Sequence, residues 1–277
     1  MALLLNTNID LRIHKHIRGK IARIGGTVNQ LMDYSRAKVI DINVLDGGYG
    51  YIKKVRDIKS FRNVFGTIRR YAKQEFKHFI HGEKIPLDRR TVALDIHEAY
   101  LHPKLLNRFD AVISSNVVEH SPNPIFFLLN CYFVTKKDGY QYHAIPHYKY
   151  TYDMYRKPTP FNHFIEDFEN KTGLDDTAHI KDYTDSAITK HGWQKNFHKI
   201  YPVAYPYMHH HVYDEFNTRE LAEFMFEGVI NDIYSSQTNK DNVVLFKNTL
   251  NKKFMEKYAD LANSYSKNFL CDNFISQ

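Results

Sequence analysis

The sequence predicts an α/β fold with a seven-stranded, mostly parallel sheet and helices on both faces. Two observations predict it. Short apolar runs typical of strands alternate along the chain with longer stretches that have the length of helices. The last two runs are separated only by the polar loop 236–241, which is too short for a helical crossover, so we expect them to close the sheet as an antiparallel pair.

Five apolar runs in the first half of the chain are predicted to be the parallel strands. Several of them end on a polar or flexible group, and the first breaks at Gly25 and Gly26. A helix is expected between the fourth and fifth strands, with Pro124 in its first turn, followed by a tight turn over 136–139. The five strands are 20–26, 37–43, 90–96, 109–116 and 140–146, and the helix covers 122–134.

The last third of the chain repeats this pattern. Asn217 with Glu220 three residues later predicts a capping box at the start of a helix that Gly228 ends. The closing strands and a helical tail follow. We expect a single domain over 1–250 with insertions at about 44–90 and 147–216, closing strands at 229–235 and 242–250, and the tail at 251–277.

Composition limits the class of protein. A hydrophobic content of 43% and a negative mean hydropathy suit a soluble globular protein, and no apolar run approaches the roughly 18 residues that span a bilayer. Cys131 and Cys271 lie too far apart to suggest a disulfide framework, and the first residues are too short an apolar run for a signal peptide. We therefore expect a cytoplasmic protein without a transmembrane segment.

Polar residues and glycines gather where the predicted parallel strands end. In open α/β sheets this edge binds ligands. Paired glycines let a backbone approach a ligand closely. An acid ending the second strand can accept hydrogen bonds from ribose hydroxyls, and one ending the third can face an adenine amino group. The predicted nucleoside-shaped pocket contains Gly25, Gly26, Asp41, Asp95, Ser115 and Asn116.

Residues 109–147 carry a resemblance to a known family. The run "FDAVISSNVVEHSPNPIFFLL", followed by "VTKKDGYQYHAIPH", resembles the fourth and fifth strand region of class I S-adenosylmethionine-dependent methyltransferases. The stretch 150–168 is similar to a subset of these enzymes associated with surface-polysaccharide biosynthesis. The resemblance covers about residues 17–249 and implies a Rossmann-like fold with S-adenosylmethionine as cofactor. It also implies that Ser115 and Asn116 lie at the cofactor, with Glu119 and His120 beside the methyl donor.

The chain departs from the family pattern at two places. Arg23 stands where the family usually has an acid, two residues before its first glycine, and the loop has two glycines instead of three. The insertion at 44–90 is also longer than the short helix common in the family. These departures favour an alternative function, in which a catalytically silent relative keeps the fold as a binding or scaffold module.

The resemblance implies an O-methyltransferase (EC 2.1.1 class) that acts on a sugar or glycan hydroxyl. Such a reaction needs alignment of donor and acceptor and a base for the hydroxyl proton. Histidine suits that task near neutral pH. His120 and His147, which follow the fourth and fifth strands, are the first candidates for the base. Asp153 is the next candidate, as a base or as the carboxylate that orients a histidine.

The region 147–216 is predicted to bind the acceptor because it is rich in Tyr, His and Asp. Tyr150 and Tyr152 offer flat faces with polar tips that suit sugar rings. His163 and Asp167 lie one helical turn apart and can bind substrate hydroxyls; together with the histidines of 209–211 they could also ligate a metal. Their spacing fits no closed structural zinc site, so we predict no metal.

The net charge of +7 permits an acidic partner without requiring one. Basic residues concentrate at 52–79, where a solvated helix face, phosphate contact and membrane contact stay open. We expect no nucleic-acid substrate, because the chain lacks the N-P-P-Y or D-P-P-Y signature of amino-group DNA methyltransferases. The acceptor, the choice of oxygen or nitrogen, and the oligomeric state stay open.

Overall fold

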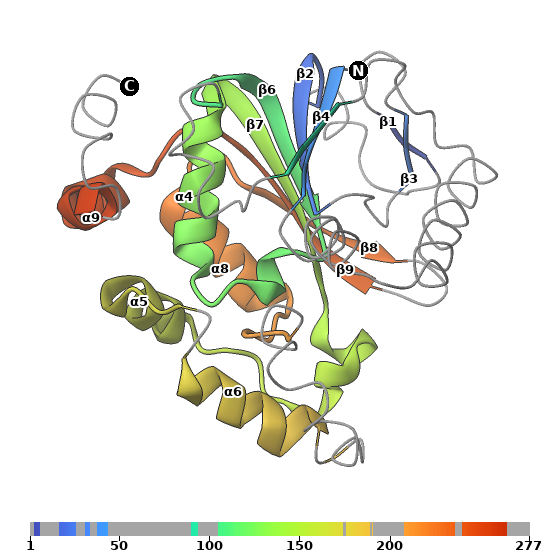
Figure 1. Ribbon diagram of the computed structural model, residues 1–277, viewed down its shortest axis with the longest axis vertical. Coiled ribbons are helices and arrows are strands. Elements are labelled where there is room, and N and C mark those ends of the chain that lie inside the picture. The colour runs from blue at the N-terminus through green and yellow to red at the C-terminus, as the bar shows by residue number, and fades with distance from the viewer. Residues whose placement is uncertain are drawn as a thin grey trace, which may run out of the picture.

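A computed structural model describes residues 3–5, 17–25, 31–33, 38–43, 90–93, 105–173, 176–188, 190, 208–235 and 240–264. Its main feature is a seven-stranded sheet with the order β5-β4-β2-β6-β7-β9-β8 (Figure 1). A separate two-stranded sheet pairs β1 (Leu3–Leu5) with β3 (Leu31–Asp33). The strands of the main sheet are β2 (Lys20–Ile24), β4 (Lys38–Asn43), β5 (Arg90–Ala93), β6 (Phe109–Ser115), β7 (Thr135–Pro146), β8 (Ile230–Ser235) and β9 (Lys240–Lys247).

Five strands of the main sheet run parallel, and β9 runs antiparallel to both β7 and β8. The predicted α/β class with a mostly parallel sheet is therefore confirmed. The order reverses at β2, which pairs with β4 on one side and β6 on the other. Crevices beyond the carboxyl ends of strands at such a switch point are where open α/β sheets bind ligands.

The predicted turn at 136–139 is wrong, because β7 runs without a break from Thr135. Along the pairing from Phe109–Thr135 to Ala111–Tyr140, β6 advances by two residues while β7 advances by five. The extra residues form a bulge in which Asp138 has a φ of 64°. Ion pairs from Lys136 to Asp110 and from Asp138 to Lys247 hold the bulge against the neighbouring strands.

Helix α8 (Glu215–Met225) corrects the predicted capping box. Asp214 is the N-cap, and its carboxylate accepts hydrogen bonds from the backbone of Phe216 and Asn217. Asn217, the predicted N-cap, stands three residues further on and accepts a hydrogen bond from the Asp214 backbone. An acid is the better cap because it satisfies two N–H groups at the positive end of the helix dipole.

The other helices follow the sequence pattern closely. Asn123 caps α4 (Pro124–Val134) by accepting a hydrogen bond from the backbone of Phe126 at 3.0 Å. Within the predicted insertion 147–216 the structure describes η3 (Tyr148–Tyr150), η4 (Tyr152–Tyr155), α5 (Phe161–Asn170), α6 (Thr177–Tyr183) and a π-helical turn (Thr184–Ile188). The predicted tail contains α9 (Lys252–Ser264). The basic stretch 52–79 lies outside the described residues.

The core has two parts, one on each face of the sheet. Helices α4, α5, α8 and α9 contribute to the larger cluster, which also contains Val112, Phe246 and other strand residues of that face. Ile21, Ile113 and Tyr142 belong to the smaller cluster on the opposite face. In Figure 1, α4 runs alongside the sheet, whereas α5 and α6 lie beyond the end of β7. Among the described helices, none is both long and apolar enough to cross a membrane.

Candidate active site

The carboxyl ends of β2, β6 and β7 form one edge of the sheet. Gly25 follows β2 with a φ of 82°, and its N–H donates to the Ile42 carbonyl at 3.1 Å. A Cβ at this position would lie 2.3 Å from Val117 Cγ2. Glycine is therefore required both by the backbone conformation and by the close approach of the segment that follows β6.

The chain turns sharply where β6 ends. Asn116 has a φ of 54°, its N–H donates to the Ala144 carbonyl at 2.9 Å, and its side chain accepts a hydrogen bond from Ser115 Oγ at 3.0 Å. This turn leads directly into η2 (Val118–His120), so it sets the position of Glu119 and His120 at the edge of the sheet. The turn at Asn116 thus explains why the polar residues that follow β6 lie at this edge of the sheet.

Glu119 is buried, at 1% exposure, yet neither of its carboxyl oxygens has a hydrogen-bond partner among the described residues. Nε2 of His120 lies 3.8 Å and Nε2 of His209 lies 3.9 Å from Oε1 of Glu119. Burial raises the pKa of Glu119 well above its ordinary value. A buried carboxyl without a hydrogen-bond partner and with a raised pKa is characteristic of functional sites.

His120 and His209 both turn their Nε2 atom toward the Glu119 carboxyl group. His120 donates from Nδ1 to the Met208 carbonyl at 3.0 Å, and His209 donates from Nδ1 to the Asp153 carboxylate. The rings meet edge to face at 4.8 Å, and Tyr152 packs against His209 at 4.4 Å. Because Nδ1 carries the proton in each ring, Nε2 is the basic nitrogen, and it faces the carboxyl group.

Asp153 holds His209 in this orientation. Burial alone would raise its pKa, but the hydrogen bond and charge of His209 and the charge of Arg156 outweigh it, so the pKa lies below its ordinary value. Arg156 Nη1 donates to Asp153 at 2.7 Å and Thr151 Oγ1 donates at 3.1 Å. The carboxylate therefore stays ionised and can stabilise a proton on His209.

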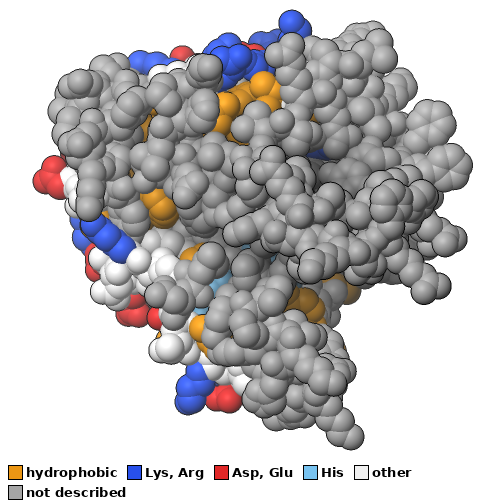
Figure 2. Space-filling model, viewed as in Figure 1, with side chains coloured by type: hydrophobic (Ala, Val, Ile, Leu, Met, Phe, Trp, Pro, Cys, Tyr) orange, Lys and Arg blue, Asp and Glu red, His pale blue; other side chains and the backbone are white. Residues whose placement is uncertain are grey.

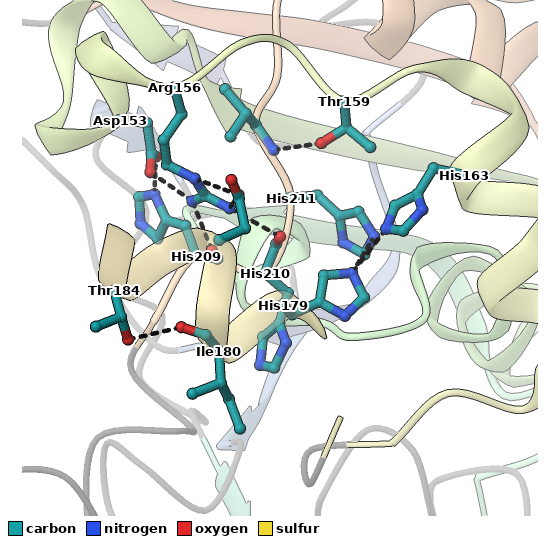
Figure 3. Close-up of polar contacts among 12 residues, drawn as sticks. Asp153, Arg156, Thr159, His163, His179, Ile180, Thr184, His209, His210 and His211 are labelled. Atoms are coloured by element: carbon teal, nitrogen blue, oxygen red, sulfur yellow. Dashed lines mark hydrogen bonds and ion pairs between the residues drawn. The ribbon is translucent and has the colours of Figure 1, made fainter. Parts of the chain in front are cut away.

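Arg156 also fixes the chain segment 208–213. Its guanidinium donates to the carbonyls of His209 at 2.8 Å and His210 at 3.1 Å (Figure 3). It also donates to Asp182 Oδ2 at 2.6 and 2.9 Å. The side chain is buried, and its planar group satisfies acceptors from three parts of the chain at once. Arg156 therefore positions His209 in two ways: it binds Asp153, which holds the His209 ring, and it binds the His209 carbonyl directly.

A second polar cluster lies next to the first. The rings of His163 from α5, His179 from α6 and His211 point toward one another (Figure 3), and the Asp167 carboxylate, also from α5, belongs to the same cluster. Only a small area of histidine surface is visible on the face in Figure 2, and three of these four side chains are buried. Burial alone would raise the pKa of Asp167, but hydrogen bonds and charge from His179 and His211 hold it below its ordinary value.

Some of the catalytic and substrate-binding residues predicted from the sequence lie in these two clusters, and others do not. The structure brings His120 and Asp153 together in the first cluster, with Tyr152 beside them, and His163 and Asp167 together in the second. His147 lies outside both: its Nε2 donates to Glu215 at 3.0 Å, and its Nδ1 accepts from the Lys149 backbone at 3.3 Å. That ring caps η3 and contacts Tyr150 at 5.7 Å.

Of the predicted cofactor residues, three are placed at the edge: Gly25, Ser115 and Asn116. Asp41 lies in β4, in register with Arg23 of β2, whose own side chain is buried. Gly26 and Asp95 lie outside the described residues. The sequence reasoning did not assign a catalytic role to His209 or a shared site to His179 and His211, and the only signal was the run of three histidines at 209–211.

No family model and no curated protein matches the chain. Among solved structures it is similar to the CurJ carbon methyltransferase, at 12% identity and a TM-score of 0.41, covering 84% of this chain and 49% of that one. It is also similar to the trans-methyltransferase CalH in complex with SAH, at 12% identity and a TM-score of 0.42, covering 84% and 52%. A third similar structure is spermidine synthase from Thermotoga maritima, at 14% identity and a TM-score of 0.38, covering 94% of this chain and 67% of that one. The chain spans about half the length of the first two.

Proposed function

We propose that this protein is an S-adenosylmethionine-dependent methyltransferase (EC 2.1.1 class) that methylates a hydroxyl group, with His209 as the general base. The observation that carries this proposal is the Asp153–His209 pair beside the buried Glu119, directly after the turn that ends β6. In open α/β sheets this is the edge where ligand and catalytic groups meet. A histidine oriented by a buried carboxylate is the arrangement that general-base catalysis of oxygen nucleophiles requires.

The residues at this edge fit the cofactor chemically. Gly25 projects no side chain, and Ser115 and Asn116 supply hydroxyl and amide groups where β6 ends. We propose that these residues hold S-adenosylmethionine together with Gly26, Asp41 and Asp95. The bound cofactor would supply a methyl group made electrophilic by its sulfonium.

The chain's own residues then handle a proton. His209 Nε2 would take the proton of the acceptor hydroxyl when that oxygen accepts the methyl group. Asp153 stabilises the resulting imidazolium from the Nδ1 side. Glu119 and His120 face the same nitrogen from the other side, where they can bind the acceptor oxygen or receive the proton. No redox step is needed.

The acceptor proposed from the sequence is a sugar or glycan hydroxyl in surface-polysaccharide biosynthesis. Tyr150, Met154 and Tyr155 are about half exposed, and they lie in η3 and η4 on either side of Asp153. Exposed aromatic faces suit the apolar face of a sugar ring, and these residues neighbour Asp153 in sequence. Tyr152, partly buried and packed against His209, would support the base and not the acceptor.

A calorimetric titration with S-adenosylmethionine and S-adenosylhomocysteine tests the cofactor first. We expect micromolar binding that Asp41→Ala weakens. Methyl transfer to a panel of sugar acceptors then tests the base: His209→Gln should lower kcat by about 10²-fold to 10⁴-fold, while His147→Gln keeps most of the activity. Loss of activity in His147→Gln but not in His209→Gln would overturn the assignment of the base.

The alternative is a catalytically silent protein that keeps the fold for binding. Arg23, in place of the family's acid, favours it. The same titration separates the two proposals. Absence of heat and of thermal stabilisation at millimolar cofactor would remove the methyltransferase proposal and leave the binding module.

A further inference from the structure

We propose that His163, Asp167, His179 and His211 form a closed binding site for a tetrahedral divalent metal ion, with Zn²⁺ as the best match. The site lies between α5, α6 and the segment 208–213 (Figure 3). It is separate from the Glu119, His120 and His209 cluster and does not depend on the proposed methyl transfer. The sequence-based expectation was that the protein binds no metal.

The distances between donor atoms match a tetrahedral ion. His179 Nε2 lies 3.1 Å from His163 Nε2 and 3.2 Å from His211 Nε2. Asp167 Oδ2 lies 2.7, 3.4 and 3.5 Å from the Nε2 atoms of His211, His179 and His163. Metal–ligand bonds of about 2.0 Å in a tetrahedron place neighbouring donors about 3.3 Å apart, so four donors already surround one point.

The opposite ring nitrogens are held as they are around metal-bound histidines. His211 donates from Nδ1 to the Ser121 carbonyl at 3.0 Å, and His179 donates from Nδ1 to Asp176 Oδ2 at 2.8 Å. Carbonyl and carboxylate oxygens can only accept, so Nδ1 carries the proton and Nε2 has the lone pair in the neutral ring. This outer contact fixes the tautomer and aims Nε2 at the centre.

The centre therefore gathers lone pairs that repel one another unless a positive charge lies between them. A proton bridges one pair of atoms at a time, for example His211 and Asp167. In that case Nε2 of His179 still faces Nε2 of His163 at 3.1 Å, and this contact is favourable only if His163 also carries its proton on Nε2. A metal ion at the centre satisfies all four donors together. That is why we infer a metal in preference to a protonated histidine cluster.

The donor set selects the type of ion. Three imidazole nitrogens and one carboxylate suit Zn²⁺ and neighbouring transition metals, whereas Mg²⁺ and Ca²⁺ prefer oxygen. Four protein ligands leave no open position, which is characteristic of a structural site. The ion would join α5 and α6 to the segment that carries His209, two residues before His211.

Metal content in two matched variants tests this site. Protein purified without chelators should contain one zinc per chain by elemental mass spectrometry. Asp167→Asn should lower the content at least tenfold, because it removes the charged ligand. Glu169→Gln, at an exposed position on the same helix that contacts none of the four ligands, makes the same acid-to-amide change and should keep the full content. Equal loss in both variants would overturn the proposal.

A second measurement covers the case in which Asp167→Asn fails to fold. Wild-type protein is stripped with a chelator, checked by circular dichroism, and titrated with Co²⁺ and Zn²⁺. We expect uptake of one ion per chain, with the intense visible absorption of tetrahedral Co²⁺ and a higher Tm. Folded protein that takes up neither ion, or binds Co²⁺ with only the weak spectrum of an octahedral site, would contradict the assignment.

Discussion

At the scale of single residues, the most informative group is Glu119. It is buried beside two histidine edges, but no hydrogen bond satisfies its carboxyl oxygens among the described residues. Leaving a buried polar group unpaired costs about 1–3 kcal/mol, so its presence needs a reason outside stability. A role in binding the acceptor or receiving a proton supplies that reason.

Replacing Glu119 with Gln should therefore stabilise the protein, and the gain should depend on pH. The folded-state pKa of Glu119 is raised, so the wild type has no penalty below about pH 4.5 and loses stability as pH rises above it. The advantage of Glu119→Gln should grow by about 1.4 kcal/mol per pH unit until the folded-state pKa is reached. Urea unfolding from pH 4.5 to 7.5 measures it.

The exposed Glu220→Gln is the control for this titration. Its stability should stay within about 0.5 kcal/mol of the wild type at every pH. A constant difference between Glu119→Gln and wild type across the range would show that Glu119 is ionised normally, which would contradict the buried, unpaired environment.

Residue-level reasoning from the sequence had a clear limit. Position after a predicted strand was enough to single out Ser115, Asn116 and His120. Asp153 was also predicted as a carboxylate that could orient a histidine. Its partner could not be predicted, because His209 lies 56 residues away in sequence and reaches Asp153 only through the tertiary fold.

At the scale of elements, the segment 208–213 is held by polar contacts as well as by the burial of Met208, Val212 and Tyr213. Arg156 binds two carbonyls of this segment and pairs with Asp153 and Asp182. The backbone of the segment also pairs with that of Tyr148, Thr159 and Glu119, so contacts with several parts of the chain decide its path. The catalytic and metal-binding proposals both depend on that path, because His209 and His211 lie on it.

Arg156→Gln should therefore destabilise the protein by about 3 kcal/mol, because it leaves the buried Asp153 carboxylate without its cationic partner. Lys157→Gln, the same change at the exposed neighbouring position, should cost less than about 0.5 kcal/mol. Chemical denaturation of both variants at pH 7.5 measures the two values. A loss in Arg156→Gln no larger than that in Lys157→Gln would show that the segment is held by other contacts.

Elements with strong local signals were predicted well, whereas tertiary contacts changed their boundaries. Asp138 and Gly139 have the composition of a turn, but β7 pairs with β6 on both sides of them, at Thr135 and at Tyr140, so they become a bulge within one strand. The cap of α8 moved from Asn217 to Asp214 for a similar reason. The Asn217 amide donates to the carbonyls of Thr159 and Val212, contacts that the local sequence does not reveal.

At the scale of the whole molecule, a buried polar network links the centre of the sheet to its closing strand. Ser114 Oγ donates to His143 Nδ1 at 2.7 Å, and His143 Nε2 donates to Gln141 at 3.1 Å. Gln141 donates to Asn248 at 2.6 Å, and Asn248 donates to the Tyr132 carbonyl at 3.0 Å. Parallel and antiparallel parts of the sheet and α4 are thereby joined through fixed donors and acceptors, which favours a single strand register.

This network makes the stability of the whole molecule sensitive to acid. Burial lowers the pKa of His143 to about 3, so the folded protein keeps the ring neutral while the unfolded chain binds a proton near pH 6.5. The contribution of His143 to the free energy of unfolding is fully present above pH 6.5 and is lost as pH falls toward 3. Between pH 6.5 and 5 the loss is about 2 kcal/mol, at about 1.4 kcal/mol per pH unit.

His143→Gln tests this because it keeps hydrogen-bonding groups but cannot titrate. The variant should be less stable than the wild type at pH 8, since its amide fills the site imperfectly, and the gap should narrow by about 2 kcal/mol from pH 6.5 to 5. Denaturant unfolding at four pH values measures both the stability difference at pH 8 and its change between pH 6.5 and 5. A gap that stays constant over this range would mean that His143 titrates alike in the folded and unfolded chains. Water would then have to reach the His143 ring, which would contradict its burial in the hydrogen-bond network.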